Sequence, residues 1–269
     1  MIRIAIGVVS PAVLAASATM SDISAAVRSD LAPAGKLRVG INFGNNLLTA
    51  RDPVSRAPSG IALDLAHELG RRLGAPVEIV SYESAGELAD SARTAAWEVG
   101  FLGAEPQRAN EISFSAAYLE IEATYLVPPG SPLRTIADVD REGVRIAVPA
   151  KAAYDLYLIR TLQRARLVQA PGADAAFKIF VSDKMEALAG LKPRLVADHD
   201  NLPGSRIIEG RFTAVQQAVG TPRGPKGREA GAKYLREFVE DVKATGLVAR
   251  AIESNGVRGV SVAPMAVSQ

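Results

Sequence analysis

The chain of 269 residues contains no cysteine, which excludes disulfide bonds, thiolate metal sites and a cysteine nucleophile. Only two histidines occur, His67 and His199, and neither lies in a sequence typical of metalloproteases or serine hydrolases. His67 falls within a helical pattern, where we expect a helix surface. His199 lies between aspartates, where we expect a polar loop. We therefore predict no catalytic residue, no metal site and no bound cofactor.

An excess of one charge is also missing. The chain has 31 basic and 29 acidic residues, a net charge of +2, and the two signs are interspersed. This balance predicts no nucleic-acid partner. Beyond the N-terminus no segment is apolar for long enough to cross a membrane, so we expect no stable membrane insertion. The apolar fraction of 48% suffices for a sizeable core, in one or two domains.

The N-terminal residues 1–18 have the outline of a secretory signal peptide. Arg3 supplies a positive charge, apolar and small residues follow, and Ala16-Ser17-Ala18 is typical of a cleavage site. The basic region is short, and Pro11 interrupts the apolar stretch. The pattern predicts export, and a cytoplasmic protein with an N-terminal extension is the alternative.

Strands and helices alternate along the rest of the chain. In the first half we predict strands at 36–43, 77–82 and 99–102, with helices at 60–73 and 84–96 between them and a loop at 44–59. In the second half we predict an extended segment at 122–128, a short helix at 136–140, strands at 145–148, 167–169 and 205–208, and helices at 151–166 and 174–180. Residues 185–191 fit a helix end or a strand. An extended segment at 213–220 and helices at 229–245 and 247–254 complete the prediction. The alternation implies parallel sheets.

These elements form two α/β units with similar patterns. Extended segments near 122–127 and 213–219 join the units, and the second segment returns the chain to the first unit. We expect one lobe from residues 36–122 and 218–262 and a second from 127–213. Two crossings of this kind suit a hinge, with a ligand in the cleft between the lobes.

The segment from Trp97 to Glu120 carries the clearest functional signal. A buried strand is predicted to end in the small-residue turn Gly103-Ala104-Glu105-Pro106, and Arg108 follows on a short helix. Ligands of open α/β sheets bind at strand ends, and a guanidinium there suits a carboxylate or phosphate. A surface arginine is the alternative.

This segment, together with Phe114, Ser115 and Tyr118, resembles the central motif of the periplasmic solute-binding proteins for polar amino acids (bacterial extracellular solute-binding proteins, family 3). Further landmarks match in order, at 37–40, 60–66, 136–139, 144–148 and 233–246. The resemblance implies the α/β, two-lobed type II periplasmic-binding fold with a hinged double crossover. It also implies a monomeric periplasmic receptor that binds a small carboxylated solute through Arg108 and delivers it to the permease of an ABC importer.

Two departures from the family pattern bear on the ligand. The hydroxyl-bearing turn before a second-lobe helix is replaced by Pro149-Ala150-Lys151-Ala152, and the aspartate that would pair with an α-ammonium group falls at about Leu191. An ammonium buried without a counter-charge is costly, so an α-amino acid needs another acid. Glu105 is our candidate, although it could instead pair with Arg108.

We predict that the ligand contacts come from Arg108, Glu105, Gly103, Ala104, Asn42, Phe43, Asn46, Tyr82, Lys151 and Ala152. For some of them a structural role is the alternative, since Asn45-Asn46 suits a turn and Lys151 suits solvent. A different function also remains open. A dehydratase acting on a prephenate-like acid has a similar fold, and Glu105 would then be its general acid.

Overall fold

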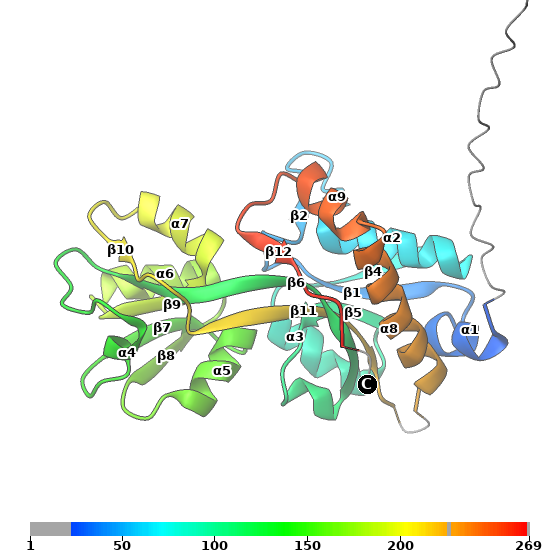
Figure 1. Ribbon diagram of the computed structural model, residues 1–269, viewed down its shortest axis with the longest axis horizontal. Helices are drawn as coiled ribbons and strands as arrows, with labels where there is room; N and C mark the ends of the chain where they lie inside the picture. Colours follow the sequence, from blue (N-terminus) through cyan, green and yellow to red (C-terminus); the bar gives the residue numbers. More distant parts are fainter. Residues whose placement is uncertain (1–22, 225–226, 268–269) are drawn as a thin grey trace, which may run out of the picture.

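The computed structural model describes residues 23–224 and 227–267, and the predicted signal peptide at 1–18 lies outside them. The described chain forms two α/β lobes that lie side by side (Figure 1). Two long strands pass from one lobe to the other. The two-lobed α/β prediction is confirmed.

The first lobe contains the parallel strands β1 (Leu37–Asn42), β4 (Val77–Tyr82) and β5 (Val99–Gly103), with β1 in the middle. The crossover from β1 to β4 contains a short hairpin, β2 (Ala50–Arg51) and β3 (Pro58–Ser59), and the helix α2 (Ile61–Leu73). The predicted apolar face of α2 is buried, with Ile61, Leu65, Leu69 and Leu73 all inaccessible to solvent. The helix predicted at 84–96 is instead α3 (Ala85–Asp90) followed by the 3-10 helix η1 (Ser91–Thr94), which ends where Ala95 adopts a left-handed conformation.

The second lobe repeats this arrangement with β7 (Arg145–Pro149) between the parallel strands β8 (Arg166–Ala170) and β9 (Ala187–Leu191). Its helices are α4 (Ile136–Val139), α5 (Ala153–Thr161), α6 (Ala173–Ser182) and α7 (Lys192–Asp200). Helix α5 is shorter than the predicted 151–166. It begins after Lys151, which is left-handed, and it ends where the Asp140 carboxylate accepts the amides of residues 163–165.

Strands β6 (Ile112–Val127) and β11 (Thr213–Pro222) connect the lobes as an antiparallel ladder (Figure 1). Strand β11 lies between β5 and β6, and β9 pairs with the far end of β6, so the order β4-β1-β5-β11-β6-β9-β7-β8 forms one continuous sheet. Strand β10 (Arg206–Ile207) pairs with that end of β6 as well, and β12 (Val260–Val262) pairs with its middle. The 3-10 helix η2 (Arg108–Asn110) precedes β6.

Besides α2 and α3, the first lobe contains the helices α1 (Ala25–Leu31), α8 (Glu229–Ala244) and α9 (Leu247–Ser254). The last two match the predicted helices, whereas α1 and β12 were not predicted. No helix within residues 23–224 and 227–267 carries an apolar stretch long enough to cross a membrane.

The prediction of a polar loop at His199 is wrong, because this residue lies in the last turn of α7. Pro193 sits in the first turn of that helix, a position where proline is favoured because its missing N–H group has no partner to lose. His67 lies on the exposed side of α2, as predicted.

Candidate ligand-binding site

A cavity of about 690 Å³ lies between the two lobes. Its walls come from the carboxyl ends of β1, β4 and β5 in the first lobe and of β7, β8 and β9 in the second, and β11 contributes Val215 and Gln217. This is the edge at which parallel α/β sheets bind ligands. The polar and charged residues of the lining are Asn42, Asn45, Asn46, Thr49, Glu83, Ser84, Arg108, Tyr154, Asp174, Arg194, Asp198, Asn201 and Gln217.

Arg108 is the most buried guanidinium of this lining, with only 6% of the residue exposed. Its Nη1 donates to the carbonyl of Gly103 at 2.6 Å, and its Nη2 donates to the carbonyl of Lys151 at 2.8 Å. Burial lowers the pKa of Arg108 to about 10, against the opposing charges of Glu105 and Asp90. The guanidinium therefore remains charged near neutral pH. Two of its five N–H groups are engaged by these bonds, and no described residue accepts from the other three.

The bond from Arg108 to Lys151 joins the two lobes, and two ion pairs do the same. Glu105 lies 2.7 Å from Nη2 of Arg160 on α5, and Asp90 lies 2.6 Å from Nζ of Lys151. The first pair is mostly buried on its acidic side, whereas the second is well exposed on both sides. We call these two ion pairs the interlobe pairs.

The two lobes also lie close together at Gly103. A β-carbon placed there would lie 2.9 Å from the β-carbon of Ala153 and 3.0 Å from Cγ1 of Val215. The small residue at the end of β5 thus lets the second lobe approach the guanidinium of Arg108.

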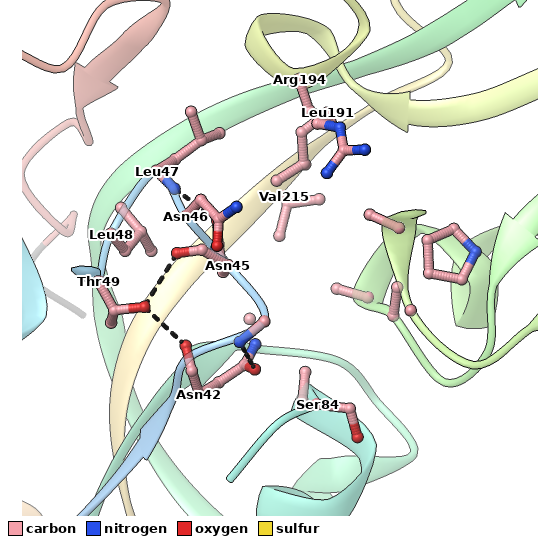
Figure 2. A pocket seen from close by; sticks show the side chains of 18 of the residues that line it. Asn42, Asn45, Asn46, Leu47, Leu48, Thr49, Ser84, Leu191, Arg194 and Val215 are labelled. Atoms are coloured by element: carbon pink, nitrogen blue, oxygen red, sulfur yellow. Dashed lines mark hydrogen bonds between the residues drawn. The ribbon is translucent and has the colours of Figure 1, made fainter. Parts of the chain in front are cut away.

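The first-lobe wall is built by the loop after β1. Asn42 and Asn45 use their side-chain oxygens to accept the amides of Gly44 and Leu47, so both shape the loop. Thr49 fixes the same loop by donating to the carbonyls of Asn42 and Asn45 (Figure 2). The interpretation of Asn45 as a turn residue is therefore confirmed. The side chain of Asn46 makes no hydrogen bond to any described residue.

The second-lobe wall carries a charged cluster, which we call the α7 cluster: Arg194, Asp198 and Asp174. Arg194 donates from Nε to Asp198 at 2.9 Å and lies 2.8 Å from Asp174 through Nη2. Figure 2 shows the Arg194 side chain next to Leu191, directed into the cavity towards Val215. Asp198 is only 4% exposed, whereas the Asp174 side chain is 93% exposed.

Of the ten predicted contacts, six line the cavity: Arg108, Gly103, Asn42, Phe43, Asn46 and Ala152. The other four, Glu105, Ala104, Tyr82 and Lys151, are not part of the lining. Glu105 pairs with Arg160 of the other lobe rather than with Arg108. Lys151 pairs with Asp90 and is therefore not simply solvated, and Tyr82 packs with the apolar residues around Trp97.

The α7 cluster and Tyr154 were absent from the predicted contacts. Residues 198–201 were predicted as a loop, so the helix that brings Asp198 to the cavity was not predicted. Two signals for this helix were present in the sequence. They are a proline in a first helical turn and the i, i+4 spacing of Arg194 and Asp198, which suits a helical ion pair.

Metal ligation finds no support in the part of the chain that the structure describes. Within it no group of three or more histidine, cysteine, aspartate or glutamate side chains is placed to hold a metal ion. The α7 cluster contains only two carboxylates, and Arg194 contacts both of them.

Several solved structures share the fold of this chain. The receptor for L-cysteine of Neisseria gonorrhoeae is 19% identical, with a TM-score of 0.70 over 84% of this chain and 92% of that one. A P235GK mutant of ArgBP from T. maritima is 20% identical, with a TM-score of 0.69 over 85% and 98%. AncCDT-1, an ancestral amino acid-binding protein and precursor of cyclohexadienyl dehydratase, is 20% identical, with a TM-score of 0.67 over 82% and 95%. At these identities the likeness shows the fold alone.

No curated protein matches the chain. The family assignment comes from the sequence itself, because residues 37–255 match the sequence model of one protein family. The resemblance predicted from the motif around Arg108 is thereby confirmed, and the chain belongs to the bacterial extracellular solute-binding proteins, family 3.

Proposed function

We propose that this solute-binding protein is the receptor of an ABC importer and that it binds a small carboxylated solute between its lobes. The observation that carries the proposal is the buried Arg108 in the wall of the interlobe cavity, with N–H groups left for an acceptor. A guanidinium in such a place binds a carboxylate through two parallel hydrogen bonds. The amino ends of α5 and α6, which line the same cavity, favour a negative charge as well.

The function also requires movement of the lobes. We place the hinge in the ladder of β6 and β11, near 122–127 and 213–219, because these two strands are the long elements shared by both lobes. The lobe boundaries follow, with 36–122 and 218–262 in one lobe and 127–213 in the other. Export to the periplasm and docking of the closed form on a permease complete the proposal, in keeping with the family.

A dehydratase on this scaffold receives less support. That alternative assigned the proton transfer to Glu105, and this carboxylate pairs with Arg160 outside the cavity lining. The geometry therefore favours a receptor over an enzyme.

The first prediction concerns Arg108→Ala. The substitution strips a buried ligand carboxylate of its partner, and we expect binding to weaken by about 2–4 kcal/mol. Ligands of the wild-type protein are found by thermal shift against amino acids, hydroxy acids, dicarboxylates and aromatic acids. Calorimetry then compares wild type and variant.

Arg93→Ala is the matched control, since its side chain is 69% exposed in the first lobe and pairs with Glu111. The control should bind like the wild type. Unchanged binding by Arg108→Ala would show that the carboxylate anchor is misassigned.

A further inference from the structure

Gln217 on β11 is a polar residue of the cavity lining that is largely buried, with only 5% of the residue exposed. The side-chain amide of its neighbour Gln216 donates to Glu120 at 2.9 Å, whereas the amide of Gln217 makes no hydrogen bond with any described residue. An amide with little access to water is costly when no donor or acceptor meets it. A molecule in the cavity can supply that partner.

The strand register places this amide beside Arg108. Strand β11 pairs with β5 so that Gln217 lies directly opposite Gly103, and directly opposite residues of antiparallel strands share one face of the sheet. A β-carbon on Gly103 would point to that face and would lie 3.6 Å from Nη1 of Arg108. The amide and the guanidinium therefore share this face. A solute carboxylate on Arg108 brings its neighbouring atoms close to Gln217.

The charges of the lining show which kind of group belongs there. Each acidic side chain of the lining already has an arginine partner. Glu83 pairs with Arg51 at 3.0 Å, and both aspartates of the α7 cluster pair with Arg194 at 2.8 and 2.9 Å. The Asp174 side chain is also 93% exposed, so water screens its charge. Among the described residues Arg108 bonds only to backbone carbonyls, so the charge left for a solute is positive.

We infer that Gln217 is a specificity-determining residue that binds an uncharged oxygen on the carbon next to the solute's carboxylate. The favoured solutes are then 2-hydroxy and 2-oxo acids. The inference rests on the proposed function and names the class of its ligand. The amide can donate to a carbonyl oxygen and can accept from a hydroxyl group, so it serves both kinds of acid. An ammonium group at the same carbon would lack a counter-charge.

The test compares four acids on a six-carbon skeleton: 2-hydroxyhexanoate, 2-oxohexanoate, hexanoate and L-norleucine. The same four patterns on three carbons are lactate, pyruvate, propionate and L-alanine, which prevents ligand size from deciding the result. Calorimetry measures each compound against wild type, Gln217→Met, Gln216→Met and Arg108→Ala. Methionine keeps the length of glutamine and removes both the donor and the acceptor. Gln216→Met is the matched control, since it makes the same change at the next position, outside the cavity lining.

We expect the wild type to bind a hydroxy or oxo acid about 3–10-fold more tightly than the plain acid, the scale of one hydrogen bond, and more tightly than the amino acid. Gln217→Met should lose this preference and keep its affinity for the plain acid, which also shows that the variant is folded. Its unliganded form should melt about 2–4 °C higher than the wild type, because an unpaired amide has been removed. Gln216→Met should keep the preference and gain no stability.

The other outcomes separate this inference from the proposed function. A preference that is absent in wild type or persists in Gln217→Met overturns the role of Gln217, and so does tighter binding of the amino acids. A lower melting temperature of Gln217→Met, with all acids weakened equally, means a structural amide and also overturns it. In these cases the carboxylate receptor stands as long as Arg108→Ala weakens every acid. If Arg108→Ala has no effect while Gln217→Met abolishes the preference, the carboxylate anchor falls instead. Failure of both skeletons to bind wild type overturns the inferred ligand class.

Discussion

At the residue scale, each lobe holds its central strand with the same pair of charged side chains. Arg38 at the start of β1 forms two side-chain hydrogen bonds with Glu98, and Arg145 at the start of β7 does the same with Glu186. In both cases the glutamate also accepts the backbone amide of its arginine. The two pairs differ in exposure, since the Glu98 side chain is 1% exposed and that of Glu186 is 36% exposed.

This difference gives a prediction from two identical substitutions. We expect Glu98→Gln to reduce the free energy of unfolding by about 2–4 kcal/mol, because it leaves a partly buried arginine without its counter-charge. Glu186→Gln should cost about 1 kcal/mol or less, as for a pair near the surface. Urea unfolding of both variants provides the comparison. Equal losses would mean that burial does not set the strength of these pairs.

The sequence allows some residues to be predicted and hides others, for physical reasons. Arg108 was predictable because a buried strand, a small-residue turn and a guanidinium follow one another within 12 residues, 97–108. The partners of Glu105 and Lys151 were not predictable, because Arg160 and Asp90 reach them from the opposite lobe. Local patterns carry no information on which charges meet when two lobes approach.

At the scale of the elements, apolar periodicity predicted α2, α8 and α9 well because each helix buries one apolar stripe. It failed for α7, which has few buried apolar residues and owes its place to Pro193 and the Arg194–Asp198 pair. Extended segments were predicted at 122–128 and 213–220, yet β6 starts at Ile112. The first half of β6 was not predicted as a strand, because small, polar and aromatic side chains alternate along it.

Helices α2 and α8 are joined by a charge network that predicts a dependence on pH. Glu68 binds Arg71 and Arg72 of its own helix, and Arg72 reaches Asp241 of α8 at 2.7 Å. Hydrogen bonds from the arginines lower the pKa of Glu68 to about 2, although burial opposes this. In the unfolded chain the pKa is near 4.5. The stabilisation is therefore complete above about pH 4.5 and disappears as the pH falls towards 2.

We expect Glu68→Gln to lower the free energy of unfolding by about 1–2 kcal/mol at pH 7, with allowance for solvent screening, and by much less at pH 2.5. Denaturant unfolding of wild type and variant at both pH values isolates this contribution. Glu237→Gln, in an exposed pair on α8, is the control and should show little change at either pH. A Glu68→Gln deficit that stays constant down to pH 2.5 would contradict the assignment.

At the scale of the whole molecule, the interlobe pairs are charged contacts that the proposed separation of the lobes would break. Glu105 is largely shielded from solvent in its pair with Arg160, whereas both partners of the Lys151–Asp90 pair are more than half exposed. Screening by water weakens the second pair much more than the first. The shielded pair should therefore dominate the contact between the lobes.

We expect Glu105→Gln to weaken the closed form by about 1–2 kcal/mol, a shift of about 5–30-fold towards the open form. Small-angle scattering of the unliganded protein should then show a larger radius of gyration. Asp90→Asn, which removes the exposed pair, should change the scattering little. Identical scattering from Glu105→Gln and the wild type would show that this pair does not govern closure.

The β6–β11 ladder also determines the order in which the molecule can be assembled. The strands β7, β8 and β9 are contiguous along the chain, whereas β5 pairs with β11, whose residues come more than 100 positions later. The three strands β7, β8 and β9 of the second lobe can pair as soon as their residues are present. The first lobe keeps an unpaired strand edge until the return strand arrives, and bringing distant segments together is the slow part of folding. Completion of the first-lobe sheet therefore depends on β11, a strand from much later in the chain.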